Sequence, residues 1–211
     1  MISITIDNTF KKPLLSTSLT DYWWDRWVLR LLQLFKQFLK QLGWFSKKPS
    51  PAGRRSKVSR KGSLISWVIP GKLAVGGSPC PEDLTWLAKA NIKVIFSLCG
   101  TSEDPLPEEI AKNFHCMRLV LPDSRYKSDI KPSQLKAAVD VVQHSVQNQL
   151  PIYVHCLAGI ERSPTVCIAY LCKHYNLEIW EALNWLKQVH PVSMPNESQL
   201  RAVQAFIKAD S

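Results

Sequence analysis

From Leu64 onward, short apolar runs alternate with longer stretches that have helical periodicity. The apolar runs, which are the expected strands, cover residues 65–69, 72–76, 93–98, 115–120 and 151–155. The expected helices cover residues 81–90, 107–113, 132–148, 162–175, 178–190 and 197–208. Strands separated by helices predict an α/β fold, with a central mixed or parallel sheet flanked by helices. Ligands of such sheets bind at the carboxyl ends of the strands, so we expect the functional residues in the loops that follow them.

Charge divides the chain into a basic N-terminal region and a neutral domain. The net charge is +10, but residues 1–63 hold 13 of the 27 Lys and Arg residues and only 3 of the 17 acidic residues. The remainder of the chain therefore has no net charge, and nucleic acid is not an expected partner of the domain. With 211 residues the chain supports one full-sized core. We expect an extension at 1–45, a basic flexible linker at 46–63 and a catalytic domain at 64–211.

Residues 22–45 have the pattern of a basic amphipathic helix that ends at Gly43. One face is apolar and begins with three tryptophans, while the opposite face carries Arg26, Arg30, Lys36 and Lys40. We expect such a helix to bind an anionic membrane surface, or a partner, through its apolar face and its cations. The alternative is that the apolar face packs against the domain. The residues of the apolar face are Trp23, Trp24, Trp27, Val28, Leu31, Leu32, Phe35, Phe38, Leu39 and Leu42.

The six cysteines lack the paired spacing of a disulfide or zinc framework, and the chain begins without the apolar core of a secretory signal. We therefore expect reduced thiols and a cytoplasmic protein, peripheral at a membrane if residues 22–45 bind one. No run of about 18 apolar residues suggests a spanning helix.

The most informative stretch is Pro-Ile-Tyr-Val-His-Cys-Leu-Ala-Gly-Ile-Glu-Arg-Ser-Pro at residues 151–164, an apolar run followed by a loop that opens a helix. The candidate nucleophile is Cys156. An ordinary cysteine is mostly protonated at neutral pH, and the attacking species is the thiolate. A helix N-terminus and the guanidinium of Arg162 both favour the anion.

The loop after Cys156 has the features of a phosphate-binding nest. Its backbone N–H groups can surround the phosphate oxygens, and Gly159 permits the turn that this requires. The planar guanidinium of Arg162 can bind two oxygens at once. Ser163 is placed to donate to the sulfur when it leaves, and His155 is expected to orient the loop. The phosphate-binding residues are Leu157, Ala158, Gly159, Ile160, Glu161 and Arg162.

These residues form the signature H-C-x5-R-[ST], and the chain resembles the cysteine-based protein phosphatases of the dual-specificity type. Residues 70–77 are similar to the opening strand pair of that family, and residues 190–196 resemble its segment before the last helix. The resemblance covers about residues 66–208. It implies a protein-tyrosine-phosphatase-like fold, hydrolysis through a phosphocysteine, and no metal or other cofactor.

A general acid is needed because an alkoxide is a poor leaving group. Two aspartates are candidates on sequence grounds. Asp123 follows an expected strand in Leu-Val-Leu-Pro-Asp-Ser, and Asp129 precedes the helix that begins near Pro132. The resemblance to dual-specificity phosphatases implies that the acid is Asp123. Asp129 is the alternative, and its other role would be to cap the following helix.

The loop has no lysine, unlike relatives that act on inositol lipids, and Glu161 would repel a polyanionic headgroup if it faced the pocket. We therefore expect a phosphoprotein substrate first, phosphorylated on tyrosine or on serine and threonine. A phospholipid comes second and a phosphorylated sugar or RNA end third. Two other functions are a phosphate-binding scaffold without turnover and a sulfurtransferase of the rhodanese type, but neither requires the nucleophile, the arginine and the acid together.

The remaining thiols have structural or protective roles in this interpretation. Cys167 and Cys172 are expected in the core of the helix that follows the loop. Cys80, Cys99 or Cys116 could form a reversible disulfide with Cys156 under oxidation, which would protect the nucleophile from irreversible damage.

Overall fold

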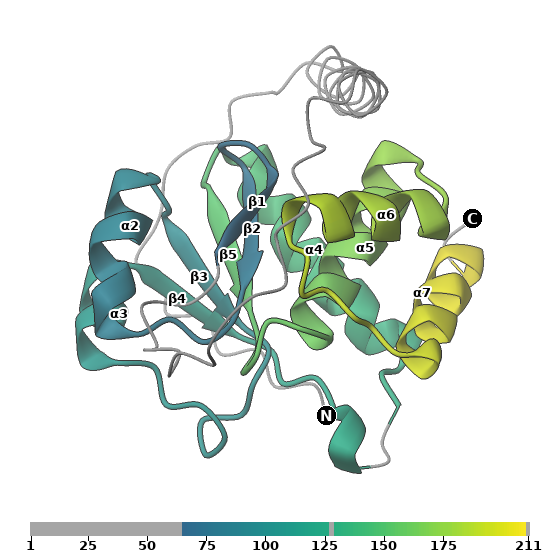
Figure 1. The fold of residues 1–211 in the computed structure, drawn as a ribbon, viewed down its shortest axis with the longest axis horizontal. Helices are drawn as coiled ribbons and strands as arrows, with labels where there is room; N and C mark the ends of the chain where they lie inside the picture. Colours follow the sequence, from purple (N-terminus) through teal and green to yellow (C-terminus); the bar gives the residue numbers. More distant parts are fainter. Residues whose placement is uncertain (1–64, 127–128, 210–211) are drawn as a thin grey trace, which may run out of the picture. The chain divides into compact units, whose positions relative to one another are not determined.

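The computed structural model describes residues 65–126 and 129–209 (Figure 1). The predicted extension, its amphipathic helix at 22–45 and the linker at 46–63 lie outside these residues. The strands are β1 (Ser66–Ile69), β2 (Leu73–Gly76), β3 (Val94–Ser97), β4 (His115–Arg118) and β5 (Ile152–His155). The helices are η1 (Pro81–Asp83), α2 (Leu84–Lys89), α3 (Glu108–Asn113), η2 (Ser124–Tyr126), α4 (Pro132–Gln147), α5 (Arg162–Tyr175), α6 (Ile179–Val189) and α7 (Glu197–Ala209).

The strands form one mixed sheet in the order β1-β2-β5-β3-β4. β1 pairs antiparallel with β2, and the other three pairs are parallel. β5 is the central strand, and all four of its residues are buried. The predicted mixed α/β sheet is therefore confirmed. The carboxyl end of β5, where the candidate loop begins, lies in the middle of the sheet.

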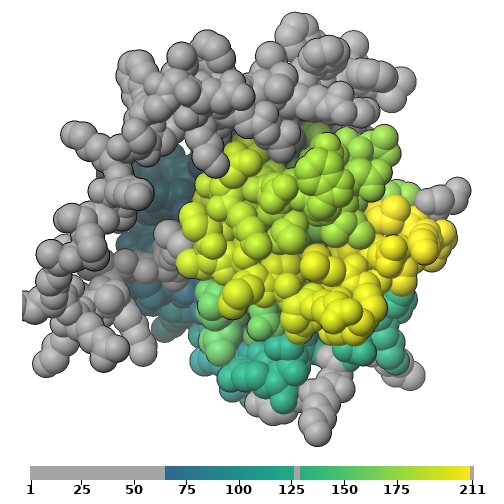
Figure 2. Space-filling model, turned by 45° about the vertical axis from the view of Figure 1, so that its right-hand side comes forward, coloured from purple at the N-terminus to yellow at the C-terminus, as the bar shows by residue number. Residues whose placement is uncertain are grey.

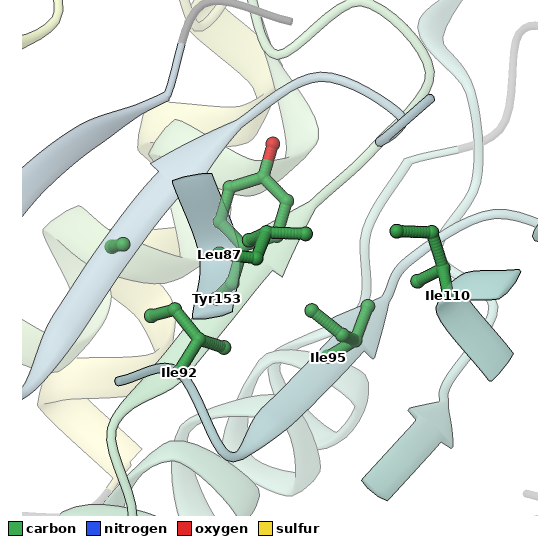
Figure 3. Packing of buried hydrophobic residues seen from close by; sticks show 6 residues of the cluster. Leu87, Ile92, Ile95, Ile110 and Tyr153 are labelled. Atoms are coloured by element: carbon green, nitrogen blue, oxygen red, sulfur yellow. The ribbon is translucent and has the colours of Figure 1, made fainter. Parts of the chain in front are cut away.

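One face of the sheet packs against α2 and α3 (Figure 1). The register places Ala74, Tyr153 and Ile95 in one row across three strands, and their side chains share this face. Figure 3 shows the resulting cluster, in which Leu87 of α2 and Ile110 of α3 meet this row. Burial of each such aliphatic side chain contributes about 1.5–3 kcal/mol relative to exposure.

The opposite face is covered by α4, α5 and α6, with α7 packed on α4 and α5. α5 is almost wholly buried, because it lies between the sheet and its helical neighbours. It ends at Asn176, which has the left-handed conformation common at the carboxyl ends of helices. Figure 2 shows the outer surface formed by α6, α7 and the segment between them. In the described ranges, no helix combines the length and apolar character needed to cross a bilayer.

The predicted elements are observed with small changes at their ends. The expected helix at 81–90 is a turn of 3₁₀ helix, opened by Pro81, followed by α2. The expected strand at 115–120 ends at Arg118. Leu119 N still donates to Ser97 O, but β3 ends there, and the chain then turns into the loop that carries Asp123.

Candidate active site

The signature stretch lies where β5 becomes α5. β5 ends at His155, residues 156–161 form the loop, and α5 begins at Arg162. Cys156 is buried, and its Sγ lies 3.4 Å from Ser163 Oγ. The start of a 14-residue helix thus points at the thiol. Its positive end favours an anion at this position.

The loop is fixed from outside through its carbonyl groups. Leu157 O accepts from Ser78 N at 3.0 Å, and Ile160 O accepts from Met194 N at 2.8 Å. Gly159 O accepts from Nε2 of the buried His190 at 2.9 Å, while Ser66 Oγ lies 3.0 Å from His190 Nδ1. Burial lowers the pKa of His190, which favours the neutral ring that this arrangement needs. Two segments distant in sequence, at Ser78 and at residues 190–194, therefore hold the loop.

The amide groups of the loop are left for a ligand. Among the described residues, no acceptor in the protein binds the backbone N–H groups of residues 157–162. The carbonyls of the same loop are directed to the scaffold, as their partners show. Such a set of N–H groups at a helix start is an anion-binding nest. The predicted phosphate-binding residues, from Leu157 to Arg162, therefore lie together around Cys156.

Gly159 makes the turn of the loop possible. It has φ +72°, and a Cβ built there would lie 2.5 Å from both Gly76 C and Gly77 N. These are backbone atoms at the end of β2, which cannot move without disturbing the sheet. A side chain at this position is therefore excluded both by the backbone conformation and by the close approach of β2.

Arg162 is nearly buried, and its guanidinium already binds carboxylates. Nη1 donates to Glu103 Oε2 at 2.9 Å, and Nη2 donates to Glu103 Oε1 at 2.5 Å. Nη2 also donates to Asp123 Oδ2 at 3.0 Å. The bidentate end predicted to bind phosphate is thus occupied by Glu103, and this hydrogen bond lowers the pKa of Glu103. The edge that carries Nε faces no hydrogen-bond acceptor among the described residues.

Of the two candidate acids, the structure brings Asp123 to the loop. Asp123 binds Arg162 and also accepts from Arg125 through the backbone N and the guanidinium. The hydrogen bonds from Arg125 lower the pKa of Asp123 to about 2. Asp129 is exposed at the other end of the loop and makes no such contact. With these partners Asp123 is a carboxylate, so it must exchange partners before it can donate a proton.

Ser163 and His155 flank the nucleophile on its buried side. Ser163 Oγ donates to Gly76 O at 3.0 Å, and its single proton can turn to the sulfur instead. His155 Nδ1 lies 3.4 Å from Cys156 O and 3.6 Å from Asp104 Oδ2. Burial lowers the pKa of His155 to about 3, so the ring is neutral and positions the loop without titrating near pH 7.

Glu161 does not have the repulsive role considered from the sequence. Its Oε2 accepts from Ser124 Oγ at 2.5 Å and lies 3.4 Å from Gln199 Nε2. The carboxylate therefore joins the phosphate loop to η2 and α7. Because it is held by these donors, it does not argue against a charged lipid headgroup.

All six cysteines are free thiols. The pKa of Cys99 is raised to about 12, chiefly by burial; the charge of Arg162 opposes this rise and the charge of Cys156 adds to it. The pKa of Cys80 is raised to about 11 by burial and by Glu82 and Asp83. Of the three candidates for a disulfide, Cys99 is buried and interacts with the charges of both Arg162 and Cys156. Cys167 and Cys172 are buried in α5, as predicted.

Three contributors to the site were not identified from the sequence. Glu103 follows β3 at the carboxyl edge of the sheet, and Arg125 lies two residues after Asp123. Their position in these loops was a signal, since the ligands of such sheets bind there. His190, by contrast, gives no sequence signal for its contact with Gly159. The described residues contain no cluster of side chains suited to a metal ion.

Comparison with known proteins supports the family resemblance that the signature around Cys156 suggested. The family described as dual specificity phosphatase, catalytic domain, matches residues 75–208. Dual specificity protein phosphatase 14 of Mus musculus is 44% identical over 73 residues, which are 33% of this chain and 37% of the relative. Phosphatidylglycerophosphate phosphatase PTPMT2 of Arabidopsis thaliana is 25% identical over 139 residues, which are 66% of this chain and 61% of the relative. The chain therefore spans less than two thirds of either relative.

Solved structures share the fold. PTPMT1 in complex with PI(5)P has a TM-score of 0.61 at 20% identity, covering 69% of this chain and 95% of that chain. The human tyrosine phosphatase-like serine/threonine/tyrosine-interacting protein has a TM-score of 0.63 at 19% identity, covering 69% and 97%. The family match extends over more than half of the sequence and includes the whole loop around Cys156. The chain therefore belongs to the dual specificity phosphatase family, within the cysteine-based protein tyrosine phosphatase superfamily.

Proposed function

We propose that this chain hydrolyses phosphomonoesters in phosphoproteins through a phosphocysteine formed at Cys156. The observation that carries the proposal is the loop itself. The six backbone N–H groups of residues 157–162, which have no acceptor among the described residues, directly follow the buried thiol of Cys156 at the start of α5, where Arg162 places its guanidinium. This arrangement suits a tetrahedral dianion and a nucleophile in line with it.

In the first step, the thiolate of Cys156 attacks phosphorus, a P–S bond forms and the P–O bond to the leaving group breaks. Asp123, protonated in the substrate complex, gives its proton to the departing oxygen. The loop amides and Arg162 stabilise the equatorial oxygens. Glu103 holds the end of the guanidinium that carries Nη1 and Nη2, so the Nε edge is the one presented to the phosphate.

In the second step, water attacks the phosphocysteine and the P–S bond breaks. The Asp123 carboxylate accepts the proton of the water, which restores the acid. The sulfur leaves as a thiolate, and Ser163 turns its hydroxyl from Gly76 O, 3.0 Å away, to Sγ, 3.4 Å away. Inorganic phosphate is released, and no atom changes its oxidation state.

The substrate class rests on the composition of the loop. Apart from Arg162, the loop contains no cation, and its side chains include Leu157, Ala158 and Ile160. One phosphate on an otherwise uncharged group fits this lining better than a headgroup with several phosphates. The similarity to dual specificity protein phosphatase 14 of Mus musculus, 44% identical over 73 residues, supports a protein substrate. We infer activity on phosphotyrosine and on phosphoserine or phosphothreonine.

A phospholipid is the second candidate, because apolar side chains are exposed on the loops around the site. Leu157 lies in the phosphate loop, Val192 and Met194 lie on the segment that contacts Ile160, and Val120 precedes the acid loop. An apolar rim of this kind suits insertion into a lipid interface. Phosphatidylglycerophosphate phosphatase PTPMT2 is among the relatives.

The test is a comparison of kcat/KM for three substrates: a phosphotyrosine peptide, a phosphothreonine peptide and phosphatidylglycerophosphate in vesicles. We expect the peptides to be preferred. The double variant Val192→Ser, Met194→Ser separates the two classes, because a smaller apolar rim should reduce only the reaction on vesicles. Trp180→Ser is the control, since Trp180 is also an exposed apolar residue but lies on α6. A strong preference for vesicles that this double variant abolishes would replace the protein substrate by a lipid.

We also propose a cytoplasmic enzyme that binds an anionic membrane surface through residues 22–45. The support is the sequence pattern of tryptophans and cations, since these residues are outside the described part of the chain. The full chain should sediment with anionic vesicles, and less so as salt rises, because exposed charges are screened over about 8 Å at physiological ionic strength. Removal of residues 1–63 should abolish this binding and leave the hydrolysis of p-nitrophenyl phosphate unchanged. Loss of folding on truncation, with no binding by the full chain, would assign the segment to the core instead.

A further inference from the structure

Asp123 accepts four hydrogen bonds, and two arginines donate all of them. Oδ1 accepts from Arg125 N at 2.9 Å and from Arg125 Nε at 2.8 Å. Oδ2 accepts from Arg125 Nη2 and from Arg162 Nη2, both at 3.0 Å. Each oxygen thus faces only donors. A proton on either oxygen would point at an N–H group, so this geometry selects the ionised carboxylate.

The charges around Asp123 come from three different segments. Arg125 in η2 and Arg162 in α5 are cations in direct contact, and Glu103 in the loop after β3 is an anion that shares both of them. Glu161 is held by Ser124. The two arginines outweigh Glu103, and the pKa of Asp123 falls to about 2, chiefly through Arg125. A general acid must instead carry its proton at the working pH.

The two arginines have different positions relative to the ligand site. Arg162 is buried at the start of α5 within the phosphate loop, so a bound phosphate would take its donors. Arg125 is 62% exposed and lies outside the loop. The acid loop is joined to the phosphate loop by the hydrogen bond that Ser124 Oγ donates to Glu161 Oε2 at 2.5 Å. Asp123 can therefore change partners while the neighbouring Ser124 keeps its main chain near the phosphate loop.

We propose that Arg125 is a positioning residue, the counter-ion that keeps Asp123 ionised until a substrate phosphate occupies the site. By holding the carboxylate, it also sets the upper end of the pH range in which the acid works. This inference rests on the proposed function, in which Asp123 is the general acid. Binding of a phosphate dianion removes Arg162 from Asp123 and adds negative charge, so that only Arg125 still opposes protonation.

The experiment is the pH dependence of kcat for a phosphotyrosine peptide, whose leaving group needs a proton. Its descending limb reports the acid in the substrate complex. Arg125→Gln removes the cation, which favours protonation of Asp123, so the limb should move to higher pH. We expect a displacement of roughly 0.5–1 pH unit, and therefore about a three- to tenfold higher rate above the limb. Arg125→Lys keeps the charge without the paired hydrogen bonds and should fall between the two.

Arg201→Gln is the matched control. Arg201 is 64% exposed and forms an ion pair with Glu197 at 2.6 Å, but it lies on α7. The control should leave the limb in place. With p-nitrophenyl phosphate, whose leaving group is acidic, Arg125→Gln should change kcat much less.

Different outcomes would contradict the counter-ion role of Arg125 and the proposed role of Asp123 as general acid. If Arg125→Gln folds, as its melting temperature would show, and the limb stays in place or moves to lower pH, the counter-ion role is wrong. Should Arg125→Gln unfold, the pH dependence of Arg125→Lys is measured instead. A limb that stays in place or moves to lower pH in that variant would again contradict the counter-ion role. If Asp123→Asn keeps a normal limb, the acid has been misassigned, and the proposed function fails at that residue instead.

Discussion

The two loops that carry the site are held in different ways. The phosphate loop at residues 156–161 is anchored by three groups from two segments, Ser78 and residues 190–194, which bind the carbonyls of Leu157, Gly159 and Ile160. The acid loop near Asp123 is partly exposed and is held by Ser124 and by ion pairs. The phosphate loop is therefore preformed for its ligand, whereas the acid loop must change its partners in each cycle. Substitutions in the phosphate loop should therefore cause severe losses of activity or stability. Substitutions in the acid loop should cause losses that vary with the substrate.

The largest effect is expected at the nucleophile. Cys156→Ser should abolish hydrolysis of p-nitrophenyl phosphate, because a serine alkoxide does not form at neutral pH in this site. The variant should still bind phosphate, since the amides and Arg162 remain. The measurement is the steady-state rate, with binding of vanadate or phosphate followed by calorimetry. Turnover near the parent rate would contradict a covalent mechanism.

The acid loop should give a large but substrate-dependent loss. Asp123→Asn should lower kcat by roughly 10²–10⁴ for a phosphotyrosine peptide, the usual span for losing a general acid. The loss should be smaller for p-nitrophenyl phosphate. Asp129→Asn is the control, because Asp129 is exposed on the same loop and makes no contact with Arg162. If Asp129→Asn shows the dependence on the leaving group, the two roles are reversed.

A pair of glycines tests how rigid the phosphate loop is. Gly159 and Gly71 have nearly equal φ, +72° and +70°, but a Cβ at Gly71 meets nothing within 4 Å. Gly71→Ala should cost about 1 kcal/mol, the strain of the left-handed conformation. Gly159→Ala adds a backbone clash with β2 and should cost several kcal/mol more. Urea unfolding of both variants measures the difference, and equal losses would mean that the loop can move away from β2.

The fold was predictable because it depends on local patterns. The runs that became β3 and β5 are apolar at their first three positions, and all four residues of each strand are buried, as expected of strands covered on both faces. The ends of the strands were less predictable. β4 stops where its neighbour β3 stops and not where its own apolar run does. A strand's length is set by its partner, and the sequence does not contain that information.

The site was predictable only where spacing along the chain fixes it. Cys156, Arg162 and Ser163 follow one another within a single strand-loop-helix unit, so their arrangement is local. Glu103 and Arg125 reach the guanidinium and the acid from other loops, and no periodicity relates them to the signature. Glu161 was identified from the sequence as a loop residue. Its partner Ser124 lies 37 residues away, so the direction of its carboxylate could not be inferred.

The smallest predicted effect concerns stability in mild acid, and it separates the two loops. His155 lies behind the phosphate loop, and burial lowers its pKa to about 3 from 6.5. Below pH 6.5 the unfolded chain binds a proton at this residue and the folded chain does not. Stability is therefore fully present above pH 6.5 and falls with decreasing pH, by up to about 1.4 kcal/mol per pH unit for one histidine. The lowered pKa of His190 acts in the same direction.

The acid loop responds only in a lower range, because the pKa of Asp123 falls from 3.8 to about 2, and its contribution is lost between these values. Between pH 6.5 and 5 the change thus comes from the buried side of the phosphate loop. Urea unfolding followed by circular dichroism at several pH values should show a decline that is less steep in His155→Gln, even though this variant is less stable at pH 7. His144→Gln, at an exposed position on α4, should keep the parent slope. A parent protein whose unfolding free energy does not change between pH 7 and 5 would mean that His155 is protonated in the folded state, and that the phosphate loop is more open to water than its burial implies.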